Sequence, residues 1–75
     1  MDKNILRGLE MIVLLERWID EDVKIYLKRP EEAELFGVLI GIDNKGIMIC
    51  QEDDQAYKTF AFIPFSNIAR IQRLE

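Results

Sequence analysis

Three polar residues, Asp43, Asn44 and Lys45, lie together between two apolar segments and are the side chains best placed to do chemistry in this chain. Asp and Asn accept hydrogen bonds from nearby backbone, so they predict a tight turn that ends at Gly46, where glycine tolerates a positive φ. Asp43 therefore has two open roles, because it either organises a ligand-binding loop or only completes its own turn. Lys45 also has two open roles, because its charge either contacts phosphate without reading a base or is simply solvated at the turn.

The composition excludes several classes of enzyme. The chain has no histidine, so it lacks the usual general base near neutral pH and the commonest transition-metal ligand. Its one cysteine, Cys50, has no basic neighbour in sequence and no partner for an intramolecular disulfide. The acidic runs at residues 20–22 and 52–54 lack the glycine-containing spacing of a calcium loop, so we expect solvated turns. We predict no enzymatic activity, no metal site and no cofactor.

Length and charge limit the organisation of the protein. A chain of 75 residues predicts one domain, residues 1–75, near the size at which a single core is marginally stable, so we expect self-association. The net charge of −4 argues against general affinity for polyanions, although it leaves a local basic patch open. The apolar residues 11–15 are too few to span a bilayer. Together with the single cysteine, this predicts a cytoplasmic protein that does not enter a membrane.

Apolar spacing predicts a helix followed by strands. Residues 3–18 place apolar side chains along a helical stripe. Val23, Ile25 and Leu27 alternate with polar residues, as in a strand with one buried face. The expected strands are at about residues 22–28, 35–42, 46–52 and 56–63. Glycines in and beside these strands permit sharp bends and close backbone approach. The tail is open on periodicity alone, between a helix that Ser66 caps and a strand at about 67–73.

Two spaced patterns are present, one at residues 37–43 and one at residues 63–71. A glycine, a leucine two positions later and an aspartate four positions after that are present at Gly37, Leu39 and Asp43. An apolar skeleton with gaps of four and two residues is present at Ile63, Ile68 and Ile71. Both patterns resemble motifs of the Sm and Sm-like (LSm) family, which includes the Hfq-type RNA chaperones. The resemblance implies that the tail is a strand. It also implies an N-terminal helix on a strongly bent five-stranded antiparallel sheet, an Sm-like small β-barrel of the SH3 type.

The resemblance also implies partners. Sm-like proteins form closed homo-oligomeric rings, so we expect about five to seven subunits, with the fourth strand paired to the fifth strand of the next subunit. The expected interface residues are Tyr57, Phe60, Phe62, Ile68 and Arg70. The family most often binds RNA, so we expect a non-catalytic protein that binds single-stranded RNA or acts as an RNA chaperone. The expected RNA-binding residues are Asp43, Asn44, Lys45 and Phe65.

The base-binding positions of the family differ in this chain, apart from Asp43. Lys45 and Ile47 occupy the positions where RNA-binding members stack a base and read uracil. Pro64 replaces the arginine that stacks on the base. We therefore expect a diverged specificity. The alternative function is a structural or protein-interaction ring scaffold that does not bind RNA.

Overall fold

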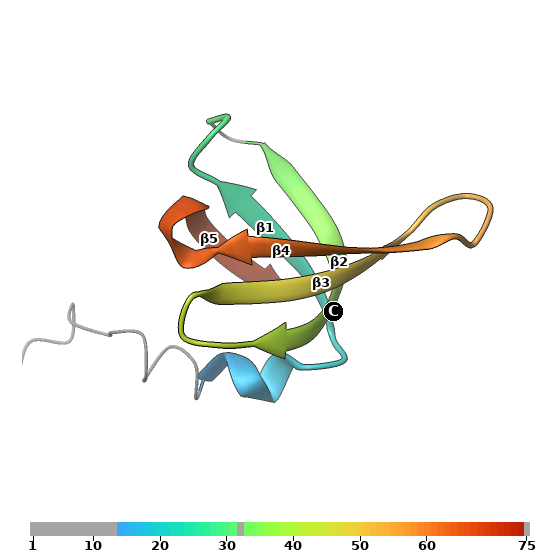
Figure 1. The fold of residues 1–75 in the computed structure, drawn as a ribbon, viewed down its shortest axis with the longest axis horizontal. Helices are drawn as coiled ribbons and strands as arrows, with labels where there is room; N and C mark the ends of the chain where they lie inside the picture. Colours follow the sequence, from blue (N-terminus) through green and yellow to red (C-terminus); the bar gives the residue numbers. More distant parts are fainter. Residues whose placement is uncertain (1–13, 32, 75) are drawn as a thin grey trace, which may run out of the picture.

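The computed structural model describes residues 14–31 and 33–74 and contains one antiparallel sheet in the order β4-β3-β2-β1-β5 (Figure 1). The strands are β1 (Asp22–Leu27), β2 (Glu34–Ile42), β3 (Gly46–Glu52), β4 (Lys58–Pro64) and β5 (Ile68–Arg73). There are two short 3₁₀ helices. The first, η1 (Glu16–Trp18), precedes β1, and the second, η2 (Phe65–Asn67), joins β4 to β5. The prediction of a mainly β fold with five antiparallel strands is confirmed. The strand ends lie within two residues of those expected.

The start of the chain enters the sheet through a helical turn. Residues 3–13 of the predicted helix lie outside the described residues, whereas Leu14 and Leu15 are helical and lead directly into η1. The turn after η1 is fastened to β2, because the Asp20 N–H donates to the Leu39 carbonyl (2.7 Å) and the Leu39 N–H donates to the Glu21 carbonyl (3.0 Å). The described part of the chain contains no helix with the length and hydropathy that a membrane span requires.

The sheet curls around its own apolar face. Figure 1 shows β3 and β4 as a layer in front of β1 and β5, with β2 connecting the two layers. Alternate residues of the strands point into the curl and form one buried cluster. The cluster contains Leu15, Val23, Ile25, Leu39, Ile47, Ile49 and Ile63. The sheet is not closed, because β4 and β5 are the two ends of the strand order.

Two glycines allow neighbouring strands to approach closely. A Cβ atom on Gly37 would lie 2.8 Å from the Cys50 carbonyl oxygen, and a Cβ atom on Gly46 would collide with the Ile63 carbonyl oxygen. None of the described glycines has a positive φ, so Gly46 does not use the left-handed conformation that glycine tolerates. Gly46 is instead needed because a larger residue would push β3 away from β4.

Replacing Gly46 by alanine should lower the free energy of unfolding by about 2–3 kcal/mol, because the new methyl group must displace the backbone of β4. Gly41→Ala is the matched control. A Cβ atom there would meet only the Met48 Cβ at 3.9 Å, an ordinary contact, so the change should stay within about 1 kcal/mol. Urea unfolding followed by the fluorescence of Trp18, the only tryptophan, measures both. Equal destabilisation by the two variants would contradict this account.

Candidate functional site

The β2–β3 turn is organised by the side chain of Asp43. One carboxylate oxygen of Asp43 accepts hydrogen bonds from the backbone N–H groups of Lys45 (2.7 Å) and Gly46 (3.0 Å). The Asp43 N–H donates to the Gly46 carbonyl (3.0 Å), which closes the turn. Of the two roles that the sequence leaves open for Asp43, the structure therefore demonstrates the turn-completing one.

The β2–β3 turn also contacts η2, which follows β4. The Phe65 N–H donates to the Lys45 carbonyl (2.9 Å), so the curl brings together two segments that are about 20 residues apart. Asn44 and Lys45 are exposed, whereas Phe65 is half-buried and packs against the core. The four predicted RNA-binding residues thus lie at one end of the sheet, although the ring of Phe65 is partly committed to packing.

Asp43→Ala should lower the free energy of unfolding by about 1–2 kcal/mol, because two backbone N–H groups lose their shared acceptor. Asp43→Asn keeps one acceptor oxygen and should lose less. Asn44→Ala, at the adjacent exposed position, is the control and should change stability by no more than about 0.5 kcal/mol. Thermal unfolding followed by circular dichroism measures all three. A melting temperature that Asp43→Ala leaves unchanged would show that the turn does not depend on this carboxylate.

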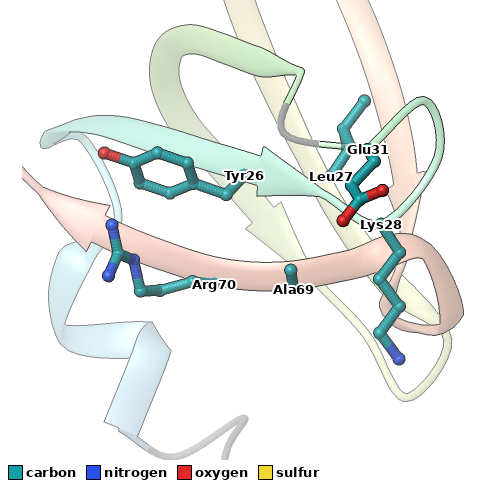
Figure 2. Close-up of a pocket in the computed structure, with 6 residues that line it drawn as sticks. All are labelled: Tyr26, Leu27, Lys28, Glu31, Ala69 and Arg70. Carbon is teal, nitrogen blue, oxygen red and sulfur yellow. The ribbon is translucent and has the colours of Figure 1, made fainter.

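The second candidate site is on the outer face of the sheet, which is the face turned away from the core. It is a shallow groove of about 470 Å³ over β1 and β5, the β1–β5 groove, which is shown in Figure 2. The groove is lined by Tyr26, Leu27, Lys28, Glu31, Ala69 and Arg70. Tyr26 and Arg70 come from facing positions of the two strands, and Lys28 and Glu31 lie at the opposite end of the groove (Figure 2).

A β-bulge shapes this groove. The pairing of β1 with β5 runs from Tyr26 opposite Arg70 to Leu27 opposite Ile68, so Ala69 is an extra residue on β5. Such a bulge bends its strand and redirects the neighbouring side chains. The small side chain of Ala69 leaves the floor of the groove open between the longer side chains.

A stacked pair of side chains forms one end of the groove. The Arg70 Cζ atom lies 4.2 Å from the centre of the Tyr26 ring, which is the distance of a cation–π contact. Hydrogen bonding from the Arg70 guanidinium, and after it from the Lys24 ammonium, holds the pKa of the Tyr26 hydroxyl below its ordinary value, because it favours the phenolate. The Tyr26 hydroxyl is also 3.5 Å from the Gln72 Oε1 atom. These contacts hold the ring against β5.

Lys24 fixes the adjoining part of the outer face. Its ammonium lies 3.1 Å from the Glu34 carboxylate and within 5.4 Å of the centres of the Tyr26 and Phe36 rings. The hydrogen bond to Glu34, and after it that to Tyr26, raises the pKa of the Lys24 ammonium. Lys24 is therefore a structural cation that is held between acid and aromatic partners.

The β1–β5 groove was not predicted, although the sequence contains a signal for it. Lys24, Tyr26 and Lys28 alternate along β1, which places a basic, an aromatic and a second basic side chain on the same outer face. That pattern is easily read as the solvated half of an amphipathic strand. The contribution of Arg70 has no local signal, because only the pairing of β1 with β5 brings it to Tyr26.

The predicted interface residues fall into two groups. Tyr57, Phe60 and Phe62 are exposed by 67%, 65% and 47% on or beside the edge strand β4. Ile68 on β5 is half-buried against the core, and Arg70 lies on Tyr26. Their participation in a subunit interface stays a prediction.

Within the described ranges, no group of three or more side chains is arranged to hold a metal ion. In the same residues, every buried polar side-chain atom has a hydrogen-bond partner. Comparisons with protein-family models, curated proteins and solved structures found no match for this chain.

Proposed function

We propose that this chain is a subunit of an Sm-like homo-oligomer that binds single-stranded RNA and catalyses no reaction. The β1–β5 groove carries the proposal. The groove is shallow, and its volume of about 470 Å³ leaves room for one nucleotide to lie against its floor. The groove offers an aromatic ring, a guanidinium and an ammonium, and an unpaired nucleotide offers a flat base and a phosphate.

The arrangement of these groups supports a division of roles. Unpaired bases stack on aromatic rings and on guanidinium planes, so the Tyr26–Arg70 pair is the stacking element. Lys28, at the other end, attracts a phosphate, whereas Glu31 repels one and restricts the path of the backbone. Stacking and charge recognise a strand without reading base edges, so we expect a weak sequence preference.

The β2–β3 turn supplies the second RNA contact of the proposal. Asn44 and Lys45 are exposed there, next to Phe65 of η2. The Lys45 ammonium provides charge for a phosphate, and Asp43 acts by holding the turn in shape. Because Phe65 packs partly against the core, we assign it a minor share of the stacking.

The open sheet supports assembly into a ring. Edge strands expose unpaired backbone groups, and here β4 and β5 are both edges. Head-to-tail pairing of β4 with β5 of the next copy uses both edges and closes into a ring when the rotation permits. The exposed aromatic residues of β4 and the half-open curl fit this arrangement. The proposal includes the N-terminal helix over residues 3–18 and a ring of about five to seven subunits.

Fluorescence anisotropy with short labelled oligouridine and oligoadenine strands tests RNA binding at about 50 and 200 mM salt. Arg70→Gln and Lys28→Gln should each weaken binding about five- to tenfold, because each removes a stacking or phosphate contact. Lys28→Gln should also reduce the slope of log affinity against log salt by about 0.7.

Lys58→Gln is the matched control for these variants, because it removes one positive charge from β4, outside the groove. It should change the affinity less than about twofold. Light scattering establishes that every variant retains the assembly of the wild type. The RNA proposal fails if the wild type does not bind at low salt, or if Lys58→Gln weakens binding as much as the groove variants.

A ring scaffold without RNA binding is the second candidate function. It is favoured by the exposed Phe60 and Phe62 on an edge strand and by the use of the Asp43 carboxylate within its own turn.

For either function, Phe62→Asp should reduce the molecular mass of the assembly, because it places a charge at the β4 edge, whereas Lys45→Glu should leave the mass unchanged. Light scattering measures both. Assembly without RNA binding at low salt would select the scaffold, and the opposite response of the two variants would reject edge pairing through β4.

A further inference from the structure

The outer face of β2, β3 and β4 is apolar, although it faces away from the core. Cross-strand pairing places Val38, Cys50 and Phe60 in one row across the three strands, and Gly41, Met48 and Phe62 in the next row. Phe36 precedes Val38 by two positions and so lies on the same face. A solvated face of an antiparallel sheet normally carries polar residues. We call the set Phe36, Val38, Met48, Cys50, Phe60 and Phe62 the outer patch.

The exposed area of the outer patch approaches what a specific interface needs. Phe36, Met48, Phe60 and Phe62 are exposed by 51%, 38%, 65% and 47%. These four side chains together expose roughly 400 Å², given the usual area of such residues. Two such patches face to face would remove roughly 800 Å² from water before their rims are counted, against the roughly 1,000 Å² of a specific interface.

We propose that the outer patch packs face to face against the outer patch of a second copy, related by a two-fold axis. Such an interface is isologous, so each apolar row meets a copy of itself. In the row of Gly41, Met48 and Phe62, the surface is close to the sheet at the glycine and projects furthest from the sheet at the aromatic ring. An axis along β3, midway between sheets about 10 Å apart, would place Phe62 of one copy over Gly41 of the other. The two rows then fill each other's hollows.

The charges around the outer patch favour a second copy over an RNA strand. Exposed aromatic residues on a sheet are also a platform for bases, but such platforms are accompanied by a positively charged groove. The two apolar rows carry no cation. At their borders, Lys24 is paired with Glu34, and Lys58 lies opposite Glu52 in the row next to Phe60. The net charge of −4 opposes a polyanion here. A border with both signs of charge suits contact with a copy of the same protein.

Face-to-face packing is independent of the edge pairing in the proposed function. Phe62 belongs to both surfaces, because it lies in the outer patch and on the edge strand β4. Met48 lies on β3 and Phe36 lies on β2, and each of these strands has a neighbour on both sides. A charge at either position therefore acts on the outer patch and leaves the β4 and β5 edges in place.

Light scattering on the wild type, on Met48→Glu and on Phe36→Glu tests the inference. Each variant should have half the mass of the wild type, whatever the number of subunits joined by their edges. Gln55→Glu adds the same charge at an exposed turn position outside the patch and should retain the wild-type mass. Far-ultraviolet circular dichroism establishes that the variants are folded. Because the two substitutions are on different strands, the result does not depend on a local effect at one position.

Several outcomes would overturn the inference. The first is a wild type with an odd number of subunits, which includes a monomer of 8.8 kDa. The second is an assembly mass that stays unchanged in both Met48→Glu and Phe36→Glu. The third is a halved mass in Gln55→Glu. If Met48→Glu retains the mass but abolishes binding of the oligonucleotides, the outer patch is an RNA platform and not an interface between copies.

Discussion

A single sheet has to enclose its own core in this protein, and the other features follow from that constraint. Buried residues from β1, β2, β3 and β4 form one cluster, which requires the sheet to bend back on itself. The bend is sterically possible because Gly37 and Gly46 carry no Cβ atom where β3 and β4 pass closest to other backbone. The apolar cluster supplies the driving force for the bend, and the glycines remove the obstacle to it.

The curl also decides which surfaces face the solvent. The curl buries one face of the sheet in the core. The other, outer face has two halves whose side chains differ in chemistry. Over β1 and β5 this face holds charged and aromatic side chains around the groove, whereas over β2, β3 and β4 it holds the apolar outer patch, with charged residues only at its borders. The incomplete closure of the curl adds two free edges. The described part of the chain thus presents three surfaces of different chemistry, which are the β1–β5 groove, the outer patch and the two sheet edges.

The β2–β3 turn illustrates how one carboxylate fixes the shape of an exposed loop. The carboxylate of Asp43 accepts the two hydrogen bonds that shape the turn, and the shaped turn in turn accepts a hydrogen bond from η2. The exposed positions Asn44 and Lys45 are therefore held in place by a neighbour that a ligand need not touch.

The sequence by itself determined the strands, because the alternation of apolar and polar residues is a local property that each segment carries independently. This alternation was sufficient to place the first four strands within two residues of their observed ends, and the acid–amide–glycine turn signal correctly located the β2–β3 turn. The fifth strand could not be told from a helix by periodicity, because the tight turn at residues 64–67 offsets the alternation. The reason for Gly46 was not local, since it depends on the approach of Ile63 from another strand. The β1–β5 groove likewise required the tertiary structure. Tyr26 and Arg70 are separated by more than half of the chain, and only the register of β1 with β5 and its bulge at Ala69 bring them together.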